Sequence, residues 1–106
     1  RSADTIISGG TNIYPQEIDD VLLAHQSVAE VCCIGVPNEE WGEEVKAVIN
    51  LESGADEDAV RKELVQLAEA KLSGFKKPKT YEFWTEELPR LPTGKIQRNL
   101  VKKRFW

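Results

Sequence analysis

Apolar residues along the chain fall into short runs, some with strand-like spacing and others with helix-like spacing. Residues 5–14 (TIISGGTNIY) place two apolar segments around adjacent glycines. This pattern predicts a β-hairpin, because glycine readily adopts the positive φ of a tight turn. The continuous apolar runs 28–36 and 45–51 and the alternating run 80–84 predict three further strands.

Three other segments have the spacing of amphipathic helices. The first begins near Pro15, which suits a first helical turn. Its expected buried stripe consists of Ile18, Val21 and Leu22. The acidic residues that complement its dipole are Glu17, Asp19 and Asp20. Residues 56–72 predict a longer helix, with Gly74 placed as its C-terminal cap, and residues 96–105 predict a short basic helix.

The order of these elements predicts the fold class. It indicates an α+β domain, in which an N-terminal β-hairpin is followed by a small three-stranded sheet covered by helices. A length of 106 residues fits one domain, so we assign residues 1–106 to it. The chain has no methionine and begins at Arg1, so we expect a fragment of a longer protein.

The two cysteines and the apolar runs bear on compartment and metal binding. Cys32 and Cys33 are adjacent within a predicted strand, where side chains point to opposite faces and cannot form an unstrained disulfide. With one histidine and no further cysteine, we expect no metal site. No apolar run approaches the ~18 residues of a membrane span and no signal peptide pattern is present, so we expect a cytoplasmic protein.

Charge is distributed unevenly along the chain. The net charge is −4, but residues 1–70 carry 15 acidic and 4 basic side chains, whereas residues 71–106 carry 3 acidic and 10 basic ones. A basic C-terminal third predicts an anionic partner, either a phosphate-bearing ligand or nucleic acid. The overall pI near 5.0 disfavours nucleic acid.

Lys95 follows Thr-Gly in the segment LPTGKIQR, directly before the predicted basic helix. The segment does not match the phosphate-binding loop G-x-x-x-x-G-K-[ST], because Pro89 replaces the first glycine and Ile96 replaces the metal-binding hydroxyl. Two interpretations remain from the residues alone. Lys95 is either a solvated lysine or an ammonium that stabilises charge developing on a phosphate or carboxylate.

Two other motifs also leave alternatives open. The glycines of residues 8–10 form either a simple hairpin turn or a place where the backbone approaches a ligand closely. The segment SGFKKPK surrounds Phe75 with lysines. It is either a solvated basic face or a site where the ring stacks on a base and the ammonium groups meet phosphates.

Taken together, four separated motifs carry a resemblance that covers essentially the whole chain. In order, they read RSADTIISGGTNIYPQEID, CIGVPNEEWGEEVKAV, LSGFKKPK and LPRLPTGKIQR. The sequence resembles the C-terminal domain of the adenylate-forming (AMP-binding) superfamily, which includes acyl-CoA synthetases, adenylation domains of peptide synthetases, and luciferases. It is most similar to the acyl-CoA synthetases.

The resemblance implies a lid that works with a large N-terminal domain absent from this chain. That domain would bind ATP, Mg²⁺ and a carboxylic acid, and the lid would close to form an acyl-adenylate. The lid would then rotate and present a second face to coenzyme A for thioester formation. By position Lys95 is the family's adenylation lysine. The isolated fragment is expected to be inactive, and the acid substrate cannot be inferred from it.

The same resemblance assigns further residues. Arg1 would lie near the nucleotide ribose, and Ala3 and Asp4 would form the hinge, although the pivot at Ala3 is commonly Asp or Lys in the family. Gly9 and Gly10 would line the tunnel for the pantetheine of coenzyme A. The residues that would meet its nucleotide are Gly74, Phe75, Lys76 and Lys77.

Three other readings remain open. A peptide-synthetase lid would use the same tunnel but transfer its adenylate to a carrier protein. A non-catalytic anion- or nucleic-acid-binding module would rely on the basic third of the chain. A stand-alone interaction domain that has lost catalysis would tolerate the loss of Lys95.

Overall fold

The fold is organised around two long antiparallel strands, β3 (Val28–Asn38) and β4 (Gly42–Leu51). The structure is a computed structural model, and it describes residues 3–106. The remaining strands are β1 (Ile6–Ser8), β2 (Thr11–Ile13) and β5 (Thr80–Trp84). The helices are α1 (Pro15–Leu23), α2 (Glu57–Lys71) and α3 (Arg98–Lys103), with a 3₁₀ turn η1 (Gly74–Lys76). The predicted α+β class and the order of elements are confirmed.

The hairpin and the remaining strands form one sheet. Its order is β2-β1-β4-β3, and β5 pairs in parallel with β4. The β1–β2 hairpin joins β4 through a single pair, Ser8 with Gly42. The sequence therefore predicted that all these strands form, but not this junction, which depends on residues that lie far apart along the chain.

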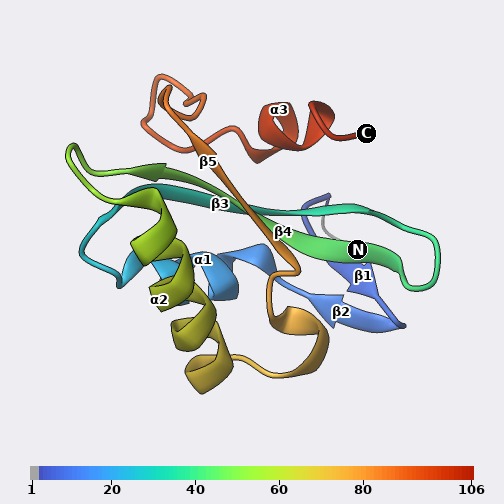
Figure 1. Cartoon of the computed structure of the whole chain (residues 1–106). Helices are drawn as coiled ribbons and strands as arrows, with labels where there is room; N and C mark the ends of the chain where they lie inside the picture. Colours follow the sequence, from blue (N-terminus) through green and yellow to red (C-terminus); the bar gives the residue numbers. More distant parts are fainter. Residues whose placement is uncertain (1–2) are drawn as a thin grey trace.

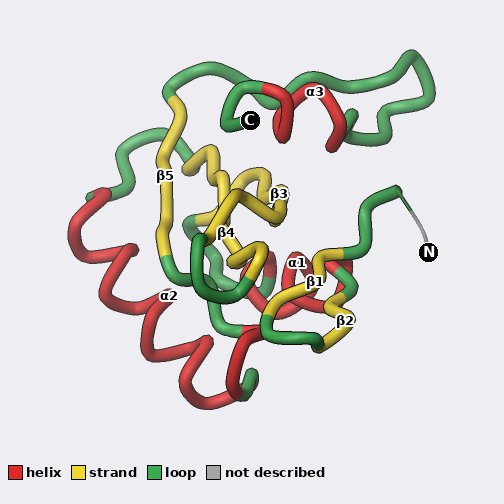
Figure 2. The backbone as a smooth tube through the Cα atoms, turned by 90° about the vertical axis from the view of Figure 1, so that its right-hand side faces the viewer, coloured by secondary structure: helices red, strands yellow, loops and turns green. Residues whose placement is uncertain are grey.

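Helices cover both faces of this sheet (Figure 1). One face packs against α1 and α2 through a core that includes Ile18, Leu64 and Cys33. The other face packs against α3 and the segment before it through a core that includes Cys32 and Val101. The turned view in Figure 2 shows α3 on one side of the strands and α2 on the other. The expected placement of the two cysteines on opposite faces is confirmed.

The predicted boundaries of four elements need correction. Strands β3 and β4 run farther toward their connecting turn than 28–36 and 45–51, because β3 is an edge strand where Pro37 needs no donated hydrogen bond. The basic helix is shorter than 96–105, because Ile96 pairs with Arg90 in a bridge. Gly74 does not cap α2, which ends at Lys71 with Leu72 extended; Gly74 begins the 3₁₀ turn instead. Within residues 3–106, every helix is too short or too polar to cross a membrane.

Candidate functional site

Lys95 directly follows a closed turn. The carbonyl oxygen of Leu91 accepts the N–H of Gly94 at 2.8 Å, and the N–H of Leu91 donates to the carbonyl oxygen of Lys95 at 2.8 Å. Gly94 has φ +93°, a conformation that favours glycine. Arg90 and Ile96 pair across the base of this small hairpin. We call residues 90–96 the lysine turn.

The side chain of Lys95 is exposed and borders three adjoining concavities. Their volumes are about 240, 320 and 190 Å³. Tyr14 lines one of them, Leu91 lines another, and Arg98 lines all three. Among residues 3–106, the Lys95 ammonium is found in no hydrogen bond or ion pair. Its charge is therefore available to a group from outside this part of the chain.

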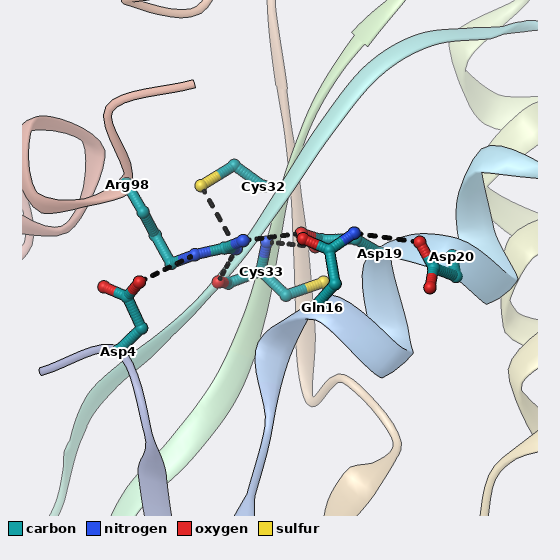
Figure 3. Close-up of polar contacts among 7 residues, drawn as sticks. All are labelled: Asp4, Gln16, Asp19, Asp20, Cys32, Cys33 and Arg98. Carbon is teal, nitrogen blue, oxygen red and sulfur yellow. Dashed lines mark hydrogen bonds and ion pairs between the residues drawn. The ribbon is translucent and has the colours of Figure 1, made fainter. Parts of the chain in front are cut away.

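Arg98, three residues after Lys95, anchors the start of α3 to the sheet (Figure 3). Its Nη2 lies 2.9 Å from Oδ2 of Asp19, and its Nη1 donates to the carbonyl oxygen of Cys33 at 2.8 Å. The other oxygen of Asp19 accepts the Cys33 N–H at 2.8 Å. Burial alone would lower the pKa of Arg98, but the charge and hydrogen bond of Asp19 outweigh burial and raise this pKa above its ordinary value. The guanidinium therefore stays charged inside the domain.

The same guanidinium reaches the expected hinge. Its Nε lies 3.9 Å from Oδ2 of Asp4, so Asp4 is tied to the body of the domain. Ala3, one residue earlier, is exposed and lies in a turn ahead of β1. Arg1, the expected ribose contact, lies outside the described residues.

The cysteines beside Arg98 have no features of a nucleophile. Burial raises the pKa of Cys32 to about 12 and raises the pKa of Cys33 well above its ordinary value. Both thiols are therefore neutral at physiological pH, and a neutral thiol is a poor nucleophile. Their contribution is to the core, as the sequence predicted.

A second region forms where the β1–β2 hairpin meets the 3₁₀ turn. Gly9 has φ +57° and Gly10 has φ +81°, so both occupy the region that favours glycine. The Gly9 N–H donates to the carbonyl oxygen of Trp41 at 3.0 Å. The rings of Trp41 and Phe75 meet edge to face with centroids 5.0 Å apart. We call Gly9, Gly10, Trp41 and Phe75 the glycine corner.

The two glycines of this corner differ in their surroundings. A Cβ atom on Gly9 would lie 2.6 Å from Cζ of Phe75, closer than real atoms approach. The same atom on Gly10 would meet nothing within 4 Å. Gly9 is therefore required by packing against the ring, whereas Gly10 leaves open space beside the backbone.

The other residues expected to bind coenzyme A lie close by but are engaged within the domain. Nζ of Lys76 lies 3.5 Å from Oε2 of Glu17, and Nζ of Lys77 lies 2.9 Å from Oε2 of Glu69. Gly74 is exposed, with φ +55°. The structure thus brings Gly9 and Phe75 into contact and places both lysines in ion pairs at the protein surface.

The lysine turn and the glycine corner are separate surfaces. In Figures 1 and 2, the segment between β5 and α3 lies apart from the β1–β2 hairpin. The concavity beside Trp41 has a volume of about 490 Å³ and is lined by Ile7, Gly42, Glu43, Lys102 and Trp106, none of which borders the concavities at Lys95. The described residues thus form two separate surfaces whose concavities have different linings.

Sequence reasoning missed several residues that build these regions. Asp19 was assigned to a helix dipole, and the pattern gave no role to Glu30, Arg90, Arg98 or Trp41. One signal was present, since Glu30 is a carboxylate inside the apolar run 28–36. A charge in such a run is costly to bury unless it is paired, so it predicts a distant cationic partner.

Known protein families and enzymes match most of this chain. The family model of the AMP-binding enzyme C-terminal domain matches residues 17–95. A long-chain-fatty-acid–CoA ligase of Bacillus subtilis is 44% identical over 98 residues, which cover 92% of this chain and 17% of that protein. The fatty acid–[acyl-carrier-protein] ligase ScoC of Streptomyces coeruleorubidus is 40% identical over 106 residues, covering 100% of this chain and 20% of that protein.

Solved structures give the same result. The o-succinylbenzoate CoA synthetase MenE of Bacillus subtilis, in complex with the acyl-adenylate intermediate OSB-AMP, superposes with a TM-score of 0.84 at 35% identity. The match covers 96% of this chain and 20% of that one. The chain thus spans about a fifth of the length of the relatives it matches.

Proposed function

The chain belongs to the family of AMP-binding enzyme C-terminal domains, and from this premise we propose that it is the lid of an ATP-dependent acyl-CoA synthetase. The overall reaction converts a carboxylic acid, ATP and coenzyme A into acyl-CoA, AMP and pyrophosphate through an acyl-adenylate. The observation that carries the proposal is the exposed Lys95, which sits on a hydrogen-bonded turn among concavities and has no ionic partner in residues 3–106.

In the first step Lys95 acts as an electrostatic clamp. A carboxylate oxygen of the acid attacks the α-phosphorus of ATP, the bond from that phosphorus to the bridging oxygen breaks, and pyrophosphate leaves. The ammonium lies between the carboxylate and the phosphate oxygens, so it orients both reactants and stabilises the charge that develops. A lysine suits this task because its three N–H donors serve several oxygens at once.

ATP and Mg²⁺ belong mainly to the N-terminal domain in this proposal. Residues 3–106 contain no cluster of three or more His, Cys, Asp or Glu side chains that could hold a metal ion. Mg²⁺ supplies charge neutralisation on the phosphates when bound. Arg1 would contact the nucleotide ribose, an assignment that rests on the resemblance alone.

In the second step the glycine corner faces the N-terminal domain and admits coenzyme A. The thiol sulfur attacks the acyl carbon, AMP leaves, and the thiol proton is lost. Gly10 leaves open space beside the backbone where a side chain would narrow the pantetheine tunnel, and Gly9 lets Phe75 pack against the hairpin at the wall of that tunnel. Phe75 offers a ring beside that backbone, and Lys76 and Lys77 would exchange their carboxylate partners for phosphates of the nucleotide.

A hinge at Ala3 connects the two steps. Asp4 is tied to the domain by Arg98, so rotation about the exposed Ala3 would carry the lid as one body. Alanine lacks the polar anchoring of the usual Asp or Lys, but its φ and ψ remain free to change. The alternation uses the two separate surfaces described above.

The test uses the full-length parent enzyme with Lys95→Ala, and Lys103→Ala as a matched control because Lys103 is also an exposed lysine, at the end of α3. One assay follows acid-dependent ATP–pyrophosphate exchange, and the other follows thioester formation from supplied acyl-adenylate and coenzyme A. We expect exchange to fall by about 10²- to 10³-fold with Lys95→Ala only, while thioester formation continues. Parental rates in both assays would refute the catalytic role of Lys95.

One observation favours a second acceptor. Lys76 and Lys77 are both paired with carboxylates of this domain, and ScoC, a ligase whose name specifies an acyl-carrier protein, aligns over the whole chain. A carrier protein would deliver its phosphopantetheine through the same tunnel without needing a nucleotide site. Competition between coenzyme A and a phosphopantetheinylated carrier protein for the acyl-adenylate distinguishes the two acceptors.

A further inference from the structure

Arg90 connects the lysine turn to the interior of the sheet. Its Nε and Nη2 both donate to Oε2 of Glu30, at 2.8 and 2.5 Å. Its Nη1 donates to the carbonyl oxygen of Gly94, the residue directly before Lys95. One guanidinium therefore bridges a strand side chain and the backbone of the turn.

Glu30 is a firm anchor for this bridge. It belongs to β3, and only 8% of it is exposed. Its second oxygen, Oε1, accepts the N–H of Leu88 at 3.0 Å. A buried carboxylate is costly unless it is fully bonded, so these contacts hold both Leu88 and Arg90 against the sheet.

Lys95 thus lies between two anchored arginines. On the N-terminal side, Arg90 is held by Glu30; on the C-terminal side, Arg98 is held by Asp19, which is 6% exposed. The two carboxylates come from β3 and α1, so the segment from Arg90 to Arg98 is held by two different elements. The ammonium of Lys95 is left outside both pairs.

We propose that Arg90, held by its hydrogen bonds to the carboxylate of Glu30, is a positioning residue for Lys95. It fixes the carbonyl of Gly94, and with it the backbone that sets where the lysine side chain begins and in which direction it extends. This inference rests on the function proposed above, because it requires Lys95 to act on the substrates. The resemblance assigns no role to Arg90 or Glu30. In this proposal, both are needed to position the backbone that carries Lys95.

The expected consequence is a loss of rate rather than of binding. Arg90→Ala leaves the turn with its backbone hydrogen bonds but removes the link from Gly94 to Glu30. A displacement of a reacting group by about 1 Å can cost 10²-fold, so we expect adenylation to slow by about ten- to a hundredfold. Within residues 3–106, no hydrogen bond or ion pair joins the glycine corner to the lysine turn, so thioester formation from supplied adenylate should keep its rate.

The experiment uses the full-length parent enzyme with Arg90→Ala, Arg90→Lys and the control Arg104→Ala. Arg104 is an exposed arginine at the end of α3 that pairs with Glu86 at 3.1 Å, and among the described residues it forms no hydrogen bond or ion pair with the lysine turn. ATP–pyrophosphate exchange, thioester formation from supplied adenylate and the melting temperature are measured for each. Arg90→Lys should fall between parent and Arg90→Ala, since one ammonium cannot serve Glu30 and Gly94 in the geometry of the guanidinium fork.

A second comparison separates positioning from an independent role. In a Lys95→Ala background, Arg90→Ala should cause no further loss of exchange, because no ammonium remains to be positioned. An undiminished loss in that background would overturn the proposal, and so would an equal fall of both half-reactions together with the melting temperature.

Failure of this inference is distinct from failure of the proposed function. Parental exchange in Arg90→Ala, combined with loss of exchange in Lys95→Ala, would overturn the positioning role and leave the function standing. Parental exchange in Lys95→Ala itself would refute the function, and the positioning role with it.

Discussion

The lysine turn and the glycine corner both have a rigid backbone, but they have different roles in the proposed function. At the turn, buried carboxylates pair with Arg90 and Arg98. Of the three cationic side chains in residues 90–98, the exposed Lys95 is the one that has no ionic partner within residues 3–106. At the corner, positive φ values and the packing of Phe75 on Gly9 exclude a side chain. The lysine turn therefore exposes the ammonium of Lys95, whereas the glycine corner leaves open space beside the backbone of Gly10.

This difference implies that substitutions in the two regions should impair the protein in different ways. A change at Lys95 alters charge without disturbing packing, because the side chain is exposed. A change at Gly9 alters packing without altering charge, because a Cβ atom would meet Phe75.

The largest expected effect is reversal of the charge at the turn. Lys95→Glu in the full-length enzyme should reduce ATP–pyrophosphate exchange by at least about 10³-fold, because a carboxylate there would repel the phosphates that an ammonium attracts. Thermal unfolding should remain within about 0.5 kcal/mol of the parent, as expected of an exposed side chain. A large loss of stability would mean that Lys95 is a structural residue.

The next effect concerns a buried cation rather than an exposed one. Arg98→Ala should lower the free energy of unfolding of the 106-residue chain by about 3 kcal/mol, because it leaves the carboxylate of Asp19 buried without its ionic partner. Denaturant unfolding measures this change, with the exposed Arg104→Ala as the matched control. Equal, small effects for both arginines would show that Arg98 is not an anchor.

Local pattern predicted the β1–β2 hairpin and helix α2, but not the small hairpin of the lysine turn or the 3₁₀ turn that contains Phe75. The Gly9–Gly10 turn is predictable because it requires positive φ at two adjacent positions, and both are glycine. Helix α2 was placed within a residue of its ends, because its apolar repeat is long. The resemblance, and not the pattern, supplied the role of Lys95.

The anchors of the lysine turn could not be predicted in the same way. Arg98 lies 79 residues from Asp19, and Arg90 lies 60 residues from Glu30. A periodic pattern in one segment contains no information about which distant segment will cover it. Asp19 therefore resembled an ordinary dipole partner near the helix start, although it is buried in the structure.

The core between the two regions should lose stability at alkaline pH. Burial raises the pKa of Cys32 from 9.0 to about 12 and that of Tyr81 from 10.0 to about 12, so the folded state keeps protons that the unfolded state releases. Stability is therefore complete below about pH 9 and is lost as pH rises toward 12, by up to about 1.4 kcal/mol per pH unit for Cys32 and by less for the partly exposed Tyr81, whose charge is screened by solvent. Urea unfolding from pH 7 to 11 measures the decline, and Cys32→Ala should make it shallower. A decline that is as steep without Cys32 would contradict this assignment.

A smaller effect separates the two glycines of the corner. Gly10→Ala should cost about 1 kcal/mol of stability through its positive φ alone, whereas Gly9→Ala should cost more, because the added Cβ also displaces Phe75. In the full-length enzyme, Gly9→Ala should slow thioester formation while exchange stays near the parental rate. Phe75→Ala tests the origin of the difference, since in that background the two alanine substitutions should become equal. If Gly9→Ala still costs more stability than Gly10→Ala in the Phe75→Ala background, the contact with Phe75 is not the cause of the difference.

The smallest effect tests whether the surface lysines at the corner act on the acceptor. Lys77→Gln breaks an exposed ion pair with Glu69 and should change stability by less than about 1 kcal/mol. If Lys77 exchanges Glu69 for a phosphate of coenzyme A, KM for coenzyme A should rise several-fold, with KM for a carrier protein unchanged. Glu69→Gln is the matched partner, and it should leave KM equal or lower because it frees the ammonium. An unchanged KM for coenzyme A in Lys77→Gln would show that Lys77 has only a structural role. The glycine corner would then contribute the pantetheine tunnel but no contact with the nucleotide of coenzyme A.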